Sequence, residues 1–196
     1  MTVTVLLVPG LRGASPGHWQ ELLADEELPG LIIQHLPTDR GIDKAARIAD
    51  LDRAVCAAAG PVLVVGHSAG TLVAMHWAAT TASATAMLLL NVPTLGEELP
   101  PAYPRRAELR DCGWLPIPTG PLEAPVIVGV SSDDPLGPPD VVHRLAAGWG
   151  ARTVDLGAVG HGNPAAGFGP WPATTKLIRH TAAKVATRTR LLPGIA

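Results

Sequence analysis

Apolar residues are grouped in six short runs, which alternate along the chain with segments of helical periodicity. Most of these runs are apolar at consecutive positions, a pattern typical of parallel strands that are buried on both faces. The runs are Val3–Val8, Leu31–His35, Val62–Val65, Ala86–Leu90, Val126–Val130 and Arg152–Leu156. This alternation predicts an α/β fold, a compact six-stranded, mostly parallel sheet with helices on both faces.

Five segments show helical spacing of apolar residues, with Gly or Pro near several of their ends. We expect helices from Pro16 or Gly17 to about Leu28, from about Ile42 to Ala59, from Ala69 to about Thr80, from Pro139 to Gly148 and from about Trp171 to Arg190. The alternation is interrupted once, by residues 91–125, which contain eight prolines. We interpret this segment as a cap-like insertion over the carboxyl edge of the sheet, with a short helix near Pro104–Asp111. We expect a single domain over residues 1–196.

The composition excludes several classes of function. The 196 residues carry a net charge of −2, and Lys and Arg are scattered, which argues against nucleic acid or a membrane surface as a partner. Cys56 and Cys112 form neither a disulfide framework nor a metal-ligand cluster, so a reduced, cytoplasmic setting is expected. No apolar run reaches the length of a membrane span. Val3–Val8 lacks a basic lead and a cleavage site, and fits the first strand better than a signal peptide.

A Gly-x-Ser-x-Gly motif occupies residues 66–70, directly after the run Val62–Val65 and directly before a predicted helix. A strand, a sharp turn and a helix are the context in which this motif presents a nucleophilic serine. The turn strains the backbone of the serine, and side chains two residues to either side would clash there. The motif therefore predicts Ser68 as a nucleophile. The alternative is a glycine-rich turn with an incidental serine.

A serine nucleophile needs a base within hydrogen-bonding reach and a third group that orients the base. Asp133 and Asp134 follow the fifth strand, and His161 follows the sixth in a glycine-rich loop, which gives the order Ser, Asp, His of the α/β hydrolases. Among seven histidines, only His161 has this placement. Residues 134–138 fit the Asp-x-hydrophobic-x-Pro pattern that often follows this strand. We therefore favour Asp134 as the acid and expect Asp133 to be a turn residue that caps the loop.

Two backbone N–H groups are expected to bind the oxyanion that develops during acyl transfer. Ala69 should supply one from the N-terminus of the helix, and Leu11 the other, because Gly10 lets the chain approach closely. Candidate pocket residues are Gly10, His18, His67 and Trp114, with Phe168 and Trp171 as further candidates. For His18 the alternative is capping of the first helix, and for the aromatic residues and His67 it is packing.

These residues resemble the small serine hydrolases of the YdeN and retinoblastoma-binding-protein-nine type, within the α/β-hydrolase superfamily. The resemblance extends over most of the chain. It lies in Val8–Gly10, Ser15–Gln20, Gly66–Gly70, Ser132–Pro135, Ala147–Ala151, Gly160-His161 and Gly167–Pro172. It implies an α/β-hydrolase fold with the triad Ser68, Asp134 and His161 and carries over no cofactor. The short cap and the lack of a separate lid domain favour a small-molecule substrate. Ala158 and Gly162 depart from the family pattern, which predicts a looser histidine loop. The Leu-x-Cys-x-Glu motif of retinoblastoma-protein binding is absent, so that partner is not expected.

The leading hypothesis is hydrolysis of a small or medium carboxylic ester, or an amide or thioester, through an acyl-enzyme on Ser68. His161 would act as general base and acid, and Asp134 would orient it. A catalytically silent binding module with this fold is the first alternative, although binding alone does not require all three residues. Acyl transfer with the same nucleophile is the second, and it differs from hydrolysis in the acceptor.

Overall fold

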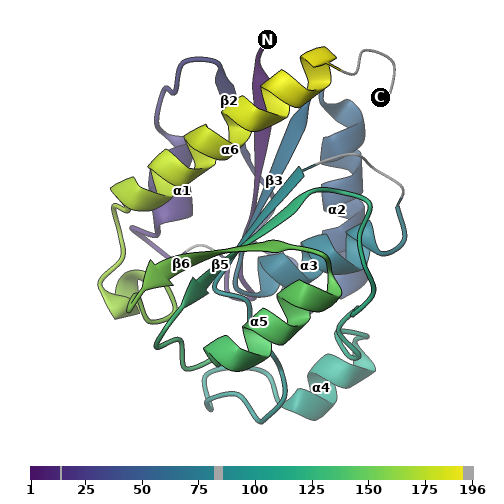
Figure 1. Ribbon diagram of the computed structural model, residues 1–196. Helices are drawn as coiled ribbons and strands as arrows, with labels where there is room; N and C mark the ends of the chain where they lie inside the picture. Colours follow the sequence, from purple (N-terminus) through teal and green to yellow (C-terminus); the bar gives the residue numbers. More distant parts are fainter. Residues whose placement is uncertain (14, 82–85, 192–196) are drawn as a thin grey trace.

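The computed structural model describes residues 1–13, 15–81 and 86–191, and Figure 1 shows their arrangement. Six strands form one sheet in the order β2-β1-β3-β4-β5-β6, and every neighbouring pair is parallel. The strands are β1 (Val3–Val8), β2 (Leu31–His35), β3 (Val62–His67), β4 (Ala86–Leu90), β5 (Val126–Ser131) and β6 (Arg152–Gly157). The predicted six-stranded α/β architecture is confirmed.

Helices cover both faces of the sheet, each over its own hydrophobic cluster. The α-helices are α1 (Trp19–Ala24), α2 (Lys44–Ala57), α3 (Ala69–Ala78), α4 (Arg106–Asp111), α5 (Pro139–Gly148) and α6 (Pro172–Leu191), and a 3-10 turn, η1, spans Pro164–Ala166. Residues of α1 and α6 pack with one face, and residues of α2, α3 and α5 pack with the other. Burial on both faces explains why β1, β3 and β4 are apolar at nearly every position.

The first helix is shorter than the sequence predicts. It ends at Ala24 with Asp25 as its C-cap, whereas the apolar spacing suggested helix to about Leu28. The Leu31 N–H instead donates to the Leu28 carbonyl, and the Val3 N–H donates to the Gly30 carbonyl. These bonds turn the chain into β2 beside β1, so the extra turn of helix is replaced by the connection.

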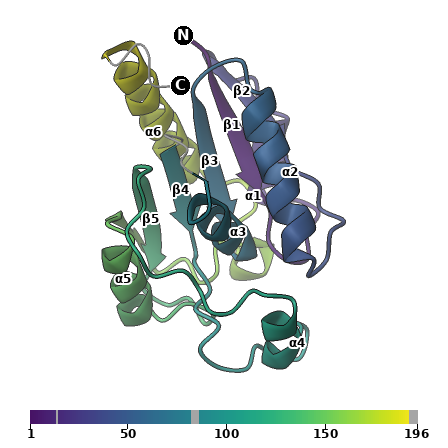
Figure 2. The same cartoon turned by 90° about the vertical axis from the view of Figure 1, so that its right-hand side faces the viewer.

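The segment 91–125 carries α4 beyond the carboxyl ends of the strands, as Figure 2 shows. Trp114 ties this segment to the body of the protein, because its Nε1–H donates to the Ile42 carbonyl at 2.8 Å and its carbonyl accepts from His76 Nε2–H at 3.2 Å. Leu109 of α4 is fully buried against the α2–α3 side of the core. The segment therefore lies where a cap over the carboxyl edge was predicted. The single-domain expectation for residues 1–196 stays a prediction, and its last residues, 192–196, lie outside the described part.

None of the helices in the described ranges combines the length and the hydropathy that a membrane span requires. Within the same residues, no group of three or more His, Cys, Asp or Glu side chains is arranged to hold a metal ion.

Candidate active site

Ser68 lies at the turn between β3 and α3 with φ 53° and ψ −129°, a left-handed conformation that L residues rarely adopt. The two flanking glycines make the turn sterically feasible. A Cβ added to Gly66 would lie 2.8 Å from the Gly70 carbonyl oxygen, and a Cβ added to Gly70 would overlap the Val8 carbonyl. The Gly-x-Ser-x-Gly spacing is thus a packing requirement of this turn.

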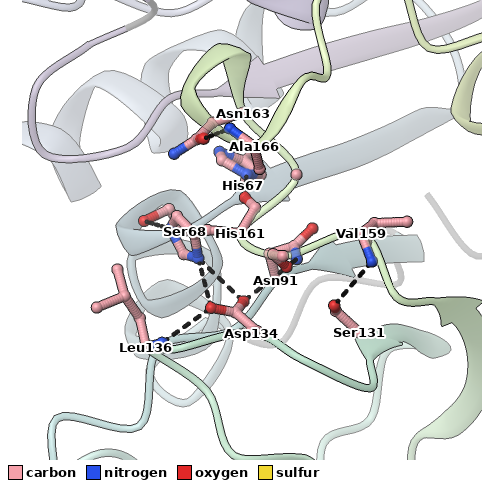
Figure 3. Close-up of polar contacts among 12 residues, drawn as sticks. His67, Ser68, Asn91, Ser131, Asp134, Leu136, Val159, His161, Asn163 and Ala166 are labelled. Atoms are coloured by element: carbon pink, nitrogen blue, oxygen red, sulfur yellow. Dashed lines mark hydrogen bonds and ion pairs between the residues drawn. The ribbon is translucent and has the colours of Figure 1, made fainter.

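Three side chains from three loops form one hydrogen-bonded chain, drawn in part in Figure 3. His161 Nε2 lies 2.8 Å from Ser68 Oγ, and His161 Nδ1 lies 2.9 Å from both carboxylate oxygens of Asp134. All three residues are buried. Because a carboxylate accepts hydrogen bonds and cannot donate them, Nδ1 carries the imidazole proton. Nε2 is then the acceptor that faces the Ser68 hydroxyl.

The Asp134 carboxylate is held by donors on both of its oxygens. The Leu136 backbone N–H donates to Oδ1 at 2.9 Å, and Asn91 Nδ2 donates to Oδ2 at 3.2 Å. Asn91 directly follows β4 and has a left-handed backbone, with φ 54°. Its Nδ2 also donates to the Gly160 carbonyl at 3.0 Å. Asn91 therefore links the acid after β5 to the histidine loop after β6.

Asp133 lies outside this chain of bonds and supports the histidine loop. Its Oδ1 accepts from the Gly160 N–H at 2.7 Å and from the Ser131 hydroxyl at 2.9 Å. On the other side of His161, Trp19 Nε1–H donates to the Gly162 carbonyl at 3.1 Å. Gly162 has φ 57°, and a Cβ there would lie 2.5 Å from Asn91 Oδ1. The glycine that predicted a looser loop thus permits close packing, and the loop is fastened on both sides of the histidine.

The two expected oxyanion donors border Ser68. Ala69 begins α3, and a Cβ on Gly10 would lie 3.3 Å from Ser68 Cβ, so the loop after β1 passes close to the serine. The buried Arg47 guanidinium of α2 binds this loop. Nη1 donates to the Pro9 carbonyl at 3.2 Å, and Nη2 donates to the carbonyls of Gly10 at 3.2 Å and Leu11 at 3.1 Å. The Gly10 carbonyl and the Leu11 N–H belong to one trans peptide, so fixing the carbonyl toward Arg47 directs the N–H away from it.

Two recesses flank Ser68, and both are bordered by Leu11, Ser68 and Tyr103. The first, here called the apolar recess, has a volume of about 10 Å³ and is also lined by Ala69, Leu72, Pro93, Leu95, Leu99, Leu109, Trp114 and Leu136. The second, called the polar recess, has a volume of about 40 Å³ and is also lined by Gly10, Arg12, Gly13, Ser15, His18, His67, His161 and Asn163. The serine thus lies between an aliphatic and a hydrogen-bonding environment.

The predicted pocket residues divide between the recesses. Gly10, His18 and His67 line the polar recess, and Trp114 lines the apolar recess with its Nε1–H turned away to Ile42. His18 also caps α1, since its Nδ1 accepts from the Gln20 N–H. Phe168 and Trp171 line neither recess. The two rings pack against each other at 4.8 Å, and Trp171 also packs edge-to-face on Trp19 at 6.0 Å.

Three imidazoles stand in a row beside the nucleophile. Ring centroids are 4.8 Å apart for His18 and His67, and 5.2 Å apart for His67 and His161. His67 Nε2–H donates to the His161 carbonyl at 2.9 Å. Burial, with His35 and His161 nearby, lowers the pKa of His18 to about 4, and burial drives the pKa of His67 well below its usual value. Both rings are neutral near pH 7.

Several polar residues of the site were not predicted from the sequence. Asn91 follows a predicted strand directly, the same signal that singled out Asp134, and could have been found on that basis. Arg47 occupies the inward face of α2, four residues before the fully buried Leu51, where a charge interrupts an apolar stripe. Arg12 and Tyr103 meet across 91 positions of sequence, and no local pattern marks such a contact.

The arrangement of parallel sheet, strained serine and loop-borne acid and base defines an α/β hydrolase. The chain belongs to the serine hydrolase family, whose model matches residues 5–180. A protein of Pectobacterium atrosepticum described as a YdeN-like hydrolase is 28% identical, with a TM-score of 0.76 over 94% of this chain and 92% of that one. The ydeN product of B. subtilis is 18% identical, with a TM-score of 0.67 over 92% and 98%. The resemblance to the YdeN type is confirmed.

More distant structures share the fold. Est1E of Butyrivibrio proteoclasticus, solved with bound ferulic acid, is 13% identical, with a TM-score of 0.65 over 98% of this chain and 90% of that one. Among curated proteins, none gives a significant match.

Proposed function

We propose that this protein is a carboxylic ester hydrolase that works through an acyl-enzyme on Ser68. The observation that carries the proposal is the continuous chain of hydrogen bonds from Ser68 Oγ through the His161 ring to Asp134. An unassisted serine hydroxyl is a weak nucleophile at neutral pH, and a base at 2.8 Å removes that obstacle. A pure binding module has no use for such a chain.

In the acylation half-reaction, Ser68 Oγ bonds to the ester carbonyl carbon while its proton moves to His161 Nε2. Asp134 stabilises the imidazolium that results. The N–H groups of Leu11 and Ala69 bind the oxyanion of the tetrahedral intermediate. The bond between the carbonyl carbon and the ester oxygen then breaks, and His161 returns the proton to the departing alcohol.

Deacylation repeats these steps with water as the nucleophile. His161 Nε2 takes a proton from water as the oxygen attacks the acyl carbon, and the bond to Ser68 Oγ breaks. The proton passes from His161 to Ser68, and the carboxylic acid leaves. Over the whole cycle, one ester and one water are consumed, and one carboxylic acid and one alcohol are formed. Amides and thioesters fit the same scheme, and an alcohol in place of water would give acyl transfer.

The setting in which we propose this activity is the cytoplasm, with a small molecule as substrate. Cys56 and Cys112 are both exposed free thiols, which suits a reducing compartment. The small volumes of the two recesses favour a small substrate over a macromolecular one.

Hydrolysis of 4-nitrophenyl acetate by the wild type and by Ser68→Ala tests the proposal. We expect Ser68→Ala to lose at least about 1,000-fold in kcat while it keeps the fold, because the covalent route is removed. Ser132→Ala is the matched control, since Ser132 is exposed and lies outside the hydrogen-bonded chain. Equal activity of wild type and Ser68→Ala would refute the assignment. A product that shifts from acid to ester when an alcohol is added would identify acyl transfer.

A further inference from the structure

The position of His161 decides which recess receives the leaving group. His161 must return its proton to the departing oxygen, so that oxygen has to leave on the side that the imidazole borders. His161 lines the polar recess and is not among the described residues that line the apolar recess. The alcohol part of the substrate therefore belongs in the polar recess, and the acyl part belongs in the apolar one.

The polar recess carries a positive charge. Arg12 is part of its lining, and the described residues that line it include no Asp or Glu. Its other ionisable side chains are His18, His67, His161 and Tyr103, and none of these is an acid of the carboxylate type. His18 and His67 are held neutral by burial, which lowers their pKa values. A guanidinium is charged at every accessible pH, so the recess presents one fixed cation to a ligand.

Tyr103 fixes the Arg12 side chain at this position. The guanidinium carbon lies 4.6 Å from the centre of the Tyr103 ring, and Arg12 Nη2 lies 3.2 Å from the Tyr103 hydroxyl. Among the residues that the structure describes, no carboxylate forms an ion pair with Arg12. A guanidinium has five N–H donors in a planar fork that matches a carboxylate. The stacked side chain can therefore receive an anion without first breaking an ion pair.

The apolar recess limits the acyl group. It is narrow, with about 10 Å³ open to the centre of a water-sized sphere, and fully buried Leu72, Leu109 and Trp114 form part of its wall. Protein interiors resist compression, so a long chain would have to displace these side chains. Leu99, an aliphatic lining residue of the cap, is half-buried rather than fully enclosed.

We propose that the substrate of this site is an ester of a short aliphatic acid with an alcohol that carries a carboxylate, and that Arg12 binds the carboxylate. This inference rests on the function proposed above and specifies its substrate class. Arg12 acts on specificity: it contacts the leaving group and takes no part in proton transfer.

Two acetate esters with and without a free carboxylate on the leaving group test the leaving-group side, with release of the phenol as the measured product. The probes are 3-acetoxybenzoate and its methyl ester, and the non-enzymatic hydrolysis rate of each is subtracted. We expect the wild type to favour the anionic ester about fivefold in kcat/KM, the size of a partly exposed charge-assisted contact. In Arg12→Gln the ratio of the two kcat/KM values should fall to about one, and in Arg12→Lys part of the preference should return. Arg105→Gln makes the same change of charge at an exposed cap residue outside the recess and should keep the wild-type ratio.

The outcomes separate this inference from the function on which it rests. If the wild type hydrolyses both esters through Ser68 with equal kcat/KM, or if Arg12→Gln keeps the preference, the charge argument is wrong and the hydrolase stands. If neither ester is hydrolysed, the proposed function fails and this inference fails with it.

The acyl side is tested on 4-nitrophenyl acetate, butyrate and octanoate. We expect kcat/KM to fall at least about tenfold from acetate to octanoate in the wild type, because each added methylene must displace packed side chains. Leu99→Ala should narrow that difference by widening the recess. A wild type that prefers octanoate would overturn the short-acyl assignment, whatever the variant does.

Discussion

Asn91 binds Asp134 from the end of the neighbouring strand, with Nδ2 at 3.2 Å from Oδ2, and the same nitrogen binds the Gly160 carbonyl at 3.0 Å. One amide group thus sets the position of the acid relative to the histidine loop. The distance between Asp134 and His161 depends on this bridge, because the two residues lie on loops after different strands.

Replacement of Asn91 by glycine should lower kcat about 10- to 100-fold with a smaller change in KM, because the histidine loses its fixed geometry while the recesses keep their lining. Glycine tolerates the left-handed backbone of this position, so backbone strain does not confuse the result. Steady-state kinetics on an aryl acetate measures both constants, and thermal unfolding checks the fold. Unchanged kcat would show that the bonds from Leu136 and His161 hold the carboxylate in place without Asn91.

The adjacent carboxylates should respond very differently to amidation. Asp134→Asn should lower kcat about 1,000- to 10,000-fold, because an amide group that donates toward Nδ1 favours the wrong imidazole tautomer. Asp133→Asn removes charge from the bonds to Gly160 and Ser131 and should cost about tenfold or less. The pair is its own control, since both variants lose one charge at neighbouring positions. A larger loss in Asp133→Asn would exchange the two roles.

Arg47 should hold the oxyanion site in place through its bonds to the loop after β1. Arg47→Met leaves the carbonyls of Pro9, Gly10 and Leu11 without this donor and frees the peptide that carries the Leu11 N–H. We expect kcat to fall about 100-fold, the typical cost of one oxyanion donor, and the free energy of unfolding to fall by about 2–4 kcal/mol.

Arg47→Lys should recover part of both losses, since an ammonium group still donates to carbonyls. Arg53→Met on the same helix is the matched control, because the Arg53 side chain is 67% exposed and its partner is Asp50, so the variant loses an ion pair without touching the loop after β1. A boronic acid forms a tetrahedral adduct on the serine, so its affinity reports whether the oxyanion site is intact. If Arg47→Met binds the boronic acid as tightly as the wild type, Arg47 has a purely structural role.

Acid should destabilise the protein partly through His18. The ordinary pKa of 6.5 applies to this side chain in the unfolded chain, and the value in the folded protein is about 4. Between these limits the unfolded state binds a proton that the folded state does not, so stability falls as pH drops from about 6.5 to about 4 and levels off below. The maximum contribution is about 3 kcal/mol.

His18→Asn isolates that contribution, because the asparagine side chain can still accept the capping bond from the Gln20 N–H. Urea unfolding at pH 7 and pH 4.5 should show a smaller loss of stability on acidification in the variant than in the wild type. Burial also lowers the pKa of His67, so His67 contributes a loss of stability in the same direction, and it does so in both proteins. Equal losses would show that His18 is not buried in neutral form.

Much of the site could be predicted from the sequence because local rules place it. The turn at Ser68 requires Gly66 and Gly70. Residues that directly follow parallel strands meet at one edge of the sheet, and this rule predicted Asp134 and His161 as site residues. The break in the alternation at residues 91–125, with its eight prolines, predicted a cap-like insertion, and the structure carries α4 of this segment beyond the carboxyl ends of the strands (Figure 2). The short α1 could not be foreseen, because the bonds of Val3 and Leu31 shape the connection from α1 to β2, and both residues lie outside the pattern of the helix itself.

Contacts across long separations were also beyond the sequence. Arg47 reaches the loop after β1 over 36 to 38 positions, and Arg12 meets Tyr103 over 91. Which side chains share a recess follows from the packing of the cap on the sheet. Composition does not determine that packing, and neither does periodicity.

An activated Ser68 should react covalently with a fluorophosphonate, and intact mass measurement detects the adduct. We expect one adduct on the wild type, none on Ser68→Ala and none or a greatly slowed one on His161→Ala, with Ser132→Ala labelled as fast as the wild type. An unlabelled wild type, or an adduct that persists in Ser68→Ala, would contradict this role of Ser68.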